Sequence, residues 1–264
     1  MESKLKTILY PSPIFGPVQS RRLGVSLGIN LMPDDGKVCT FDCIYCECGL
    51  NGERRPTHKI PTREQVAEAL ETKLTEMAVE GRLPDVLTFA GNGEPTSHPQ
   101  FADIIADTLL LRDRHCPQAK VSVLSNATNL DRPDVCEALL RIENNIQKLD
   151  TVCPDYIRLV DCPVRTDYDV KRVVEQLEAF GGKVIIQTMF LTGTDADGHD
   201  VDNTGDRYVQ PWLEAVGRIA PKQVMIYTID RETPVASLRK ASPETLDRIA
   251  ARVRELGIVV SVSY

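Results

Sequence analysis

Strand-like apolar runs alternate with amphipathic helical segments along almost the whole of this chain of 264 residues. Several of the runs are near-continuous and rich in β-branched residues, as expected of parallel strands that are covered on both faces. This order of elements implies right-handed crossovers and one parallel sheet. The expected strands are 25–31, 85–90, 120–125, 145–150, 183–191, 223–229 and 258–263.

The helices expected between these strands have readable ends. Thr62 and Gln65 can form a capping box before a helix that Gly81 ends. Ser242, followed by Pro243, opens the last helix. The strand count falls short of the eight of a closed barrel, so the sequence predicts an α/β fold, a partial (β/α)6-type barrel with a mostly parallel sheet. Further helices fit 99–111, 132–142, 169–180 and 207–220.

We find neither an internal repeat nor an interdomain linker, so residues 1–264 are expected to form one domain, with 1–24 as an N-terminal extension. The long irregular stretch 192–206 follows the fifth strand, at the sheet edge where parallel α/β proteins bind ligands. Within it, DVDNTG begins like a calcium-binding loop, but Pro211 replaces the glutamate at position twelve. A solvent-exposed lid is the favoured interpretation.

Composition limits the classes of partner. The formal net charge is −7, whereas a protein whose main task is to hold phosphates should be basic. No apolar run approaches the roughly 20 residues of a membrane span, and residues 1–6 do not resemble the start of a signal peptide. We therefore expect a cytoplasmic protein with no membrane partner, and nucleic acid is not favoured.

Four of the eight cysteines fall within residues 39–48, a density that indicates metal binding rather than disulfides in a chain without a signal peptide. The spacing C-x3-C-x2-C lets Cys39, Cys43 and Cys46 each bind a different iron of a [4Fe–4S] cluster, leaving the fourth iron without a protein ligand. An open iron suggests that a substrate or cosubstrate binds there. The dispersed cysteines are expected to be small buried hydrophobes, namely Cys116, Cys136, Cys153 and Cys162.

Three cysteines leave alternatives open. With Cys48 as a fourth ligand, the segment could hold the closed cluster of an electron carrier or the zinc ion of an interaction protein, although zinc sites usually come as two separated C-x2-C pairs. Cys153 and Cys162 could hold an auxiliary cluster, but two thiols cannot complete a cubane without other ligands.

The segment CTFDCIYC, with the aromatic Tyr45 before its last cysteine, resembles the hallmark of the radical S-adenosylmethionine (radical SAM) superfamily. The resemblance implies two cofactors, a [4Fe–4S] cluster and S-adenosylmethionine bound to its open iron. It also implies a reducing partner of flavodoxin or ferredoxin type. One electron from the cluster then gives methionine and a 5′-deoxyadenosyl radical, which abstracts a substrate hydrogen, a reaction of oxidoreductase or lyase type.

A second motif supports the resemblance. TFAGNGEPTSHP, at the end of the second expected strand, resembles the Gly-Gly-Glu element of the family. Gly91 and Gly93 would let the backbone approach the methionine moiety, and Glu94 would accept from its ammonium group. Ser125 and Asn126 lie where the family places polar groups on the cosubstrate.

Other candidates lie near strand ends. Gln187 and Tyr227 could face the barrel lumen near the adenosine, or could face the outer helical layer. A set of charged residues could line the lumen mouth and bind an anionic substrate, or could be surface and turn residues. That set comprises Lys148 and Arg231, with Arg21, Arg22 and Asp150 as weaker members.

The resemblance extends through GPVQSRRLGVSLGINL, QKLDT, IIQTMFLTG and IYTIDRETP. These segments are similar to the iron–sulfur oxidoreductases related to the tRNA wyosine-base (4-demethylwyosine) synthase. The acidic balance and the lack of a basic, aromatic-rich extension argue against tRNA, so we expect a small or side-chain substrate that the sequence does not identify. A glycyl-radical-enzyme activase and a tRNA-modifying enzyme are the alternatives.

Overall fold

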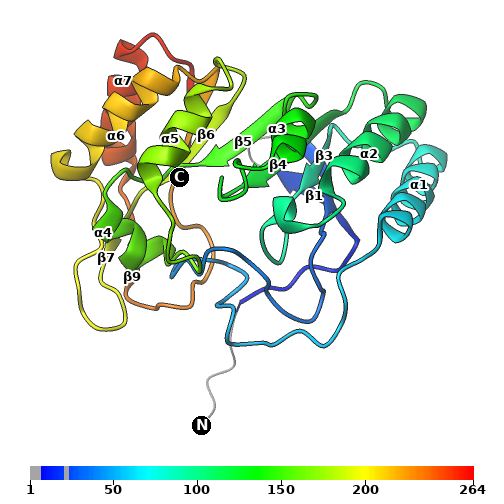
Figure 1. Cartoon of the computed structure of the whole chain (residues 1–264), viewed down its shortest axis with the longest axis horizontal. Coiled ribbons are helices and arrows are strands. Elements are labelled where there is room, and N and C mark those ends of the chain that lie inside the picture. The colour runs from blue at the N-terminus through cyan, green and yellow to red at the C-terminus, as the bar shows by residue number, and fades with distance from the viewer. Residues whose placement is uncertain (1–6, 21–23) are drawn as a thin grey trace.

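Eight strands of the computed structural model, which describes residues 7–20 and 24–264, form one sheet in the order β1-β2-β3-β4-β5-β6-β8-β10 (Figure 1). From β2 to β10 all neighbouring strands are parallel, whereas β1 runs antiparallel to β2. The strands are β1 (Ile14–Ser20), β2 (Gly24–Ile29), β3 (Val86–Phe89), β4 (Lys120–Ser125), β5 (Asn144–Lys148), β6 (Ile185–Met189), β8 (Gln223–Tyr227) and β10 (Val260–Ser263).

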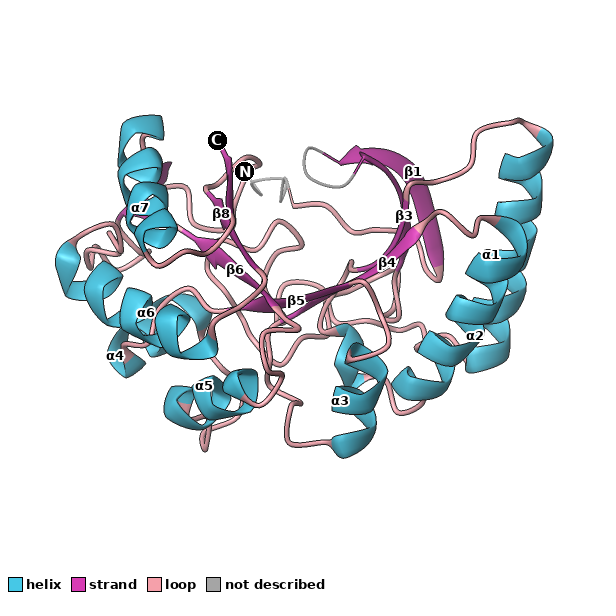
Figure 2. Ribbon diagram, turned by 90° about the horizontal axis from the view of Figure 1, so that it is seen from above, coloured by secondary structure: helices cyan, strands magenta, loops and turns pink. Residues whose placement is uncertain are grey.

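The sheet curls, and the main helices lie along its convex face (Figure 2). The concave face surrounds a lumen that stays open between β1 and β10, the two edge strands. This is the α/β partial barrel with a mostly parallel sheet that the sequence predicts. The main helices are α1 (Arg63–Val79), α2 (Phe101–His115), α3 (Pro133–Leu139), α5 (Val170–Glu178), α6 (Asp206–Ile219) and α7 (Pro243–Glu255).

The side-chain pattern explains these two layers. Val121 and Val123 of β4 pack into the main core beneath the helices, whereas Leu124 faces the lumen. In α1 the capping box of Thr62 and Gln65 is present, and the buried side chains are Val66, Leu70, Leu74 and Met77. None of the helices in the described ranges is both long and apolar enough to cross a bilayer.

The structure adds elements that the sequence did not predict. β1 falls in the expected N-terminal extension, where Pro13, Gly16 and Pro17 argue against a strand. An edge position tolerates them, and Gly28 leaves room for the Phe15 ring, which would lie 2.1 Å from a Cβ there. Arg21 and Arg22 lie outside the described residues. The other additions are η1 (Pro95–Ser97), α4 (Pro154–Tyr156), the π-helix η2 (Ile157–Asp161), and the antiparallel pair β7 (Leu191–Gly193) and β9 (Leu238–Lys240).

Candidate active site

The cysteine motif lies in the long loop between β2 and α1, beside the carboxyl ends of the parallel strands (Figure 1). Asn51 fixes the start of the motif, since its Oδ1 accepts from the Cys39 amide (3.1 Å) and its Nδ2 donates to the Cys39 and Phe41 carbonyls (3.1 and 3.3 Å). Asp42 accepts from the Asn51 amide at 2.8 Å. The loop is therefore ordered by side-chain hydrogen bonds rather than by regular secondary structure.

The arrangement of the thiols fits a cluster better than a single zinc ion. Nowhere in the described residues do three cysteine sulfurs all lie within 4.8 Å of one another, whereas Zn–S bonds of ~2.3 Å in a tetrahedral site bring the sulfurs to ~3.8 Å. Wider spacing suits a cubane, in which each thiolate binds a different iron. Burial raises the pKa of Cys39 to about 12 and raises that of Cys43 as well.

Cys48 connects the cysteine loop to the loop after β3. Its thiol is within 3.3 Å of the Gly91 carbonyl and also pairs with Cys46, whose pKa this hydrogen bond lowers to about 6. One thiol proton cannot serve both acceptors, so a thiolate at Cys46 would draw it away from Gly91. Cys48 thus contacts a predicted cluster ligand.

Residues Gly91 to Pro95 pack directly against the cysteine loop. A Cβ on Gly93 would lie 1.7 Å from the Val38 carbonyl, so only glycine allows this approach. Glu94 is 2% exposed, and burial raises its pKa. Its Oε1 accepts from the amide and hydroxyl of Thr96 (3.0 and 2.6 Å), and its Oε2 accepts from the Asn126 amide (2.7 Å).

Asn126 carries this contact on to the cysteines. Its Nδ2 donates to the Thr40 hydroxyl at 2.8 Å and lies 3.7 Å from the Cys39 sulfur. Ser125 Oγ accepts from the Ala127 amide at 3.1 Å. The structure thus brings Glu94, Asn126 and Cys39 together, and their contacts with S-adenosylmethionine stay predictions.

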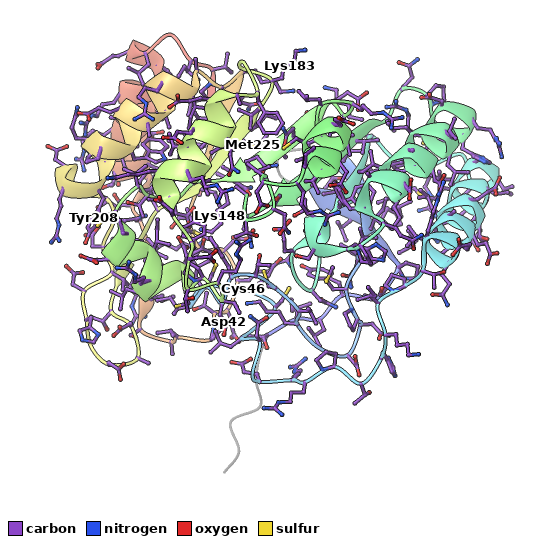
Figure 3. The ribbon with its side chains drawn as sticks, in the orientation of Figure 1. Asp42, Cys46, Lys148, Lys183, Tyr208 and Met225 are labelled. Carbon is purple, nitrogen blue, oxygen red and sulfur yellow. The ribbon has the colours of Figure 1, made fainter. Side chains whose placement is uncertain are left out.

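A buried ion network supports the other side of the loop. The Lys148 ammonium donates to Asp150 and, at 2.7 Å, to Asp161, while the Tyr45 hydroxyl also donates to Asp150. Burial opposes the charge of Lys148, but the two carboxylates outweigh it and raise the pKa of the amine. The amide of Met189 donates to Asp150 at 2.9 Å. Figure 3 labels Lys148 near the centre of the molecule and Cys46 below it.

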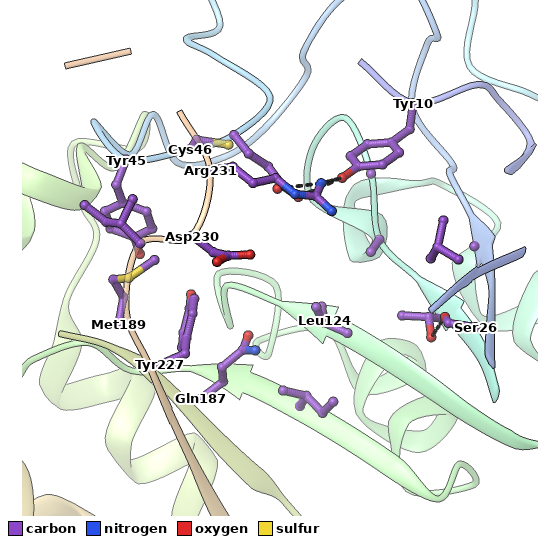
Figure 4. Close-up of a pocket in the computed structure, with 18 of the residues that line it drawn as sticks. Tyr10, Ser26, Tyr45, Cys46, Leu124, Gln187, Met189, Tyr227, Asp230 and Arg231 are labelled. Carbon is purple, nitrogen blue, oxygen red and sulfur yellow. Dashed lines mark hydrogen bonds and ion pairs between the residues drawn. The ribbon is translucent and has the colours of Figure 1, made fainter. Parts of the chain in front are cut away.

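A cavity of about 500 Å³ fills the lumen next to the cysteine loop (Figure 4). Tyr45, Cys46 and Gly91 line it on the loop side. Gln187 and Tyr227 line it from β6 and β8, which decides the orientation that the sequence left open. Lys148 does not line this cavity but lies in the ion network, so its predicted contact with a substrate has no support from its position.

Three segments meet at the mouth of the cavity. Arg231 Nη1 donates to the hydroxyl of Tyr10 (2.5 Å) and to Glu47 Oε2 (2.9 Å), and the Tyr10 hydroxyl donates to Glu47 Oε1 (2.9 Å). Glu47 lies between Cys46 and Cys48, so the bond ties the cysteine loop to the loop after β8. Arg231 thus lies where the sequence predicts it, with its guanidinium already bonded.

The remaining candidates gain less. Asp200 and Asp202 accept from backbone amides two residues further on, which is turn bonding and does not favour the calcium alternative. Cys162 donates to the Leu159 carbonyl at 3.4 Å, and the structure shows no third ligand that would join Cys153 and Cys162 within the described residues. Sequence reasoning missed Asn51 and Asp161, because their partners are set by tertiary contacts.

Comparison with known proteins decides the family. A model of the radical SAM superfamily matches residues 35–204, a segment that contains the cysteine motif, Glu94, Asn126 and Lys148. The chain belongs to the radical SAM superfamily. Members of this superfamily are enzymes.

Three curated relatives match most of this chain at 27–29% identity. A protein of Brachyspira hyodysenteriae named GTPase Obg is 27% identical over 94% of this chain, which spans only 34% of that protein. A UPF0026 protein of Helicobacter pylori is 27% identical, with 89% of this chain and 72% of that protein covered. A UPF0026 protein of Synechocystis is 29% identical, with 84% and 77% covered.

Solved structures share the fold. A radical SAM methyltransferase from Sphaerobacter thermophilus superposes with a TM-score of 0.66 at 14% identity, over 90% of this chain and 66% of that chain. Streptococcus suis SuiB bound to S-adenosylmethionine gives 0.61 at 14% identity, over 89% and 50%. TYW1 with a lysine-pyruvate adduct bound gives 0.59 at 17% identity, over 87% and 73%.

Proposed function

We propose that this radical SAM protein holds a [4Fe–4S] cluster on Cys39, Cys43 and Cys46 and uses it to cleave S-adenosylmethionine. The observation that carries the proposal is the close packing of the cysteine loop against the Glu94 loop beside a cavity of about 500 Å³. A bound cluster would supply one electron to S-adenosylmethionine, giving methionine and a 5′-deoxyadenosyl radical that takes a hydrogen atom from the substrate.

The chain's own residues would bind and orient the cosubstrate. Glu94 would bind the methionine ammonium by exchanging one of its present donors, which are the amide and hydroxyl of Thr96, the backbone amide of Asn126 and the Ser125 hydroxyl. Gly91 and Gln187 line the cavity, where they can contact the cosubstrate. The bonded set of Tyr10, Glu47 and Arg231 at the mouth would limit access of water.

We propose that the substrate is small, or a side chain, and that an electron-transfer protein of flavodoxin or ferredoxin type reduces the cluster. A glycyl-radical-enzyme activase and a tRNA-modifying enzyme are alternatives. For tRNA, phosphate-driven binding should weaken strongly between about 50 and about 200 mM salt. Micromolar binding of bulk tRNA at the lower salt that collapses at the higher would favour the tRNA alternative.

Anaerobic reconstitution with S-adenosylmethionine and dithionite tests the proposal, and 5′-deoxyadenosine is the expected product. Replacing Cys39, Cys43 or Cys46 by Ala should abolish the iron–sulfur absorbance near roughly 400 nm, because a cubane needs its thiolates. Cys48→Ala is the matched control and should retain it. If Cys48→Ala loses the cluster as completely as Cys46→Ala, the open-iron arrangement is wrong.

A further inference from the structure

Lys37 carries a buried ammonium group at the start of the cysteine loop. The residue is 3% exposed, and its Nζ donates to the Gly49 carbonyl at 2.9 Å. That carbonyl lies beyond the last cysteine of the motif, so this bond joins the two ends of the segment that holds Cys39, Cys43 and Cys46.

The carboxylate of Asp42 compensates this charge only in part. Asp42 Oδ1 lies 3.3 Å from the ammonium, but its side chain is 30% exposed and the same oxygen accepts from the Asn51 amide. Taking an ammonium out of water costs several kcal/mol unless good partners surround it. The Gly49 amide in turn donates to the Cys46 carbonyl at 3.0 Å, so the ammonium is bonded within the loop that carries the three cysteines.

We propose that Lys37 is a positioning residue for the cluster. The buried positive charge of its ammonium group offsets the negative charge of the three thiolates. The inference rests on the proposed function. A [4Fe–4S]2+ core bound by three thiolates is an anion, and the one-electron reduction that precedes cleavage of S-adenosylmethionine adds a further negative charge. A fixed cation in a poorly solvated site therefore favours both retention of the cluster and its reduced state.

The experiment compares Lys37→Met, which removes the charge, with Lys37→Arg, which keeps it. Lys59→Met, at an exposed lysine between the cysteine loop and α1, is the matched control. Each full-length protein is reconstituted anaerobically, its iron and sulfide are counted, and its midpoint potential is measured by dithionite titration monitored by electron paramagnetic resonance. Iron loss to a chelator gives the retention rate.

We expect Lys37→Met to have a more negative midpoint potential and to lose iron at least several-fold faster, whereas Lys37→Arg and Lys59→Met stay near wild type. A Lys37→Met protein that loads no cluster while Lys37→Arg loads it also supports the inference. An unchanged potential and retention in Lys37→Met would overturn it. So would equal losses in Lys37→Met and Lys37→Arg, which would mean that the shape of the lysine matters rather than its charge.

Unfolding of the iron-free proteins separates this role from a purely structural one. Iron-free Lys37→Met should still unfold in a single cooperative urea transition, because only the bond to the Gly49 carbonyl and the partial pair with Asp42 are lost when no cluster is bound. An iron-free Lys37→Met protein that is unfolded while wild type is folded contradicts the inference. If wild type binds no cluster, the proposed function is wrong. If wild type binds a cluster whose potential and retention are the same in Lys37→Met, only this inference is wrong.

Discussion

The cysteine loop is held on its two sides by different interactions. Toward β3 and β4 the contacts are hydrogen bonds that run from Glu94 through Asn126 to Thr40 and Cys39. Toward β5 and η2 they are a buried lysine with two buried aspartates and a tyrosine. Hydrogen bonds of the first kind can be lost singly at about 0.5–3 kcal/mol each, whereas removing one partner of a buried ion network leaves a charge without compensation.

The largest expected effect comes from breaking the charged side. Lys148→Met leaves Asp150 and Asp161 buried without their cation, and such losses cost about 3–5 kcal/mol. We expect a decrease of that size in the free energy of unfolding, measured with urea on the anaerobic protein. Lys73→Met is the control, since the Lys73–Glu76 pair lies on the surface and should contribute less than ~1 kcal/mol. Equal unfolding free energies for Lys148→Met and Lys73→Met would mean that the buried ion network stabilises the fold no more than a surface ion pair does.

The next effect concerns ligand binding on the hydrogen-bonded side. Glu94→Ala should leave the cluster in place and weaken binding of S-adenosylmethionine by about 1.5–3 kcal/mol, the range of a charge-assisted hydrogen bond. Glu94→Gln keeps an oxygen for the amide of Asn126 and removes the charge, so it separates the two contributions. Isothermal titration under anaerobic conditions measures both variants. A dissociation constant unchanged in Glu94→Ala would exclude Glu94 from the cosubstrate site.

How far the sequence predicts this site depends on the range of each interaction. The spacing of Cys39, Cys43 and Cys46, the capping box at Thr62 and the apolar runs are local patterns. The parallel strands and the main helices lie where the apolar runs and the helix ends predict them. Periodicity reports which face of an element is buried but not what it packs against. The pairing of Lys148 with Asp161 depends on the π-helix η2, which no local pattern indicated.

β1 was missed for a related reason. Pro17 and Gly16 are unfavourable in a strand considered alone, and only the free edge of β2 and the space at Gly28 make the pairing possible. Lys37 is a similar case, because a lysine beside a cysteine motif is expected at the surface until the fold encloses it. These features follow from tertiary contacts.

Acid should weaken the hydrogen-bonded side through His98. Its Nε2 lies 2.8 Å from the Pro61 carbonyl and its Nδ1 accepts from the Gln100 amide (3.1 Å), so the ring is neutral with its proton on Nε2. Burial lowers the pKa of His98 below its ordinary value. The unfolded chain therefore binds this proton more tightly, and stability present above the unfolded pKa of about 6.5 is lost as the pH falls below it.

His98→Gln tests this linkage, because the glutamine amide can still donate to Pro61 and does not titrate. Urea midpoints of the iron-free protein between about pH 7.5 and about pH 5.5, which bracket the ordinary histidine pKa, should fall less in the variant than in wild type. Identical slopes for the two proteins would show that protonation of His98 makes no contribution.

The smallest effect tests whether burial, rather than charge itself, sets the cost. Arg231 and Glu47 also hold the cysteine loop through an ion pair, at 2.9 Å, but their side chains are 49% and 42% exposed. Water and salt screen such a pair, so Arg231→Ala should lower the free energy of unfolding by only ~0.2–1 kcal/mol, and about 0.5 M NaCl should reduce the difference. Arg231→Lys, which keeps the charge but not the forked geometry, is the matched control. The decrease in the free energy of unfolding could instead be as large for Arg231→Ala as for Lys148→Met, and insensitive to salt. That result would mean that buried and exposed charges stabilise this loop equally.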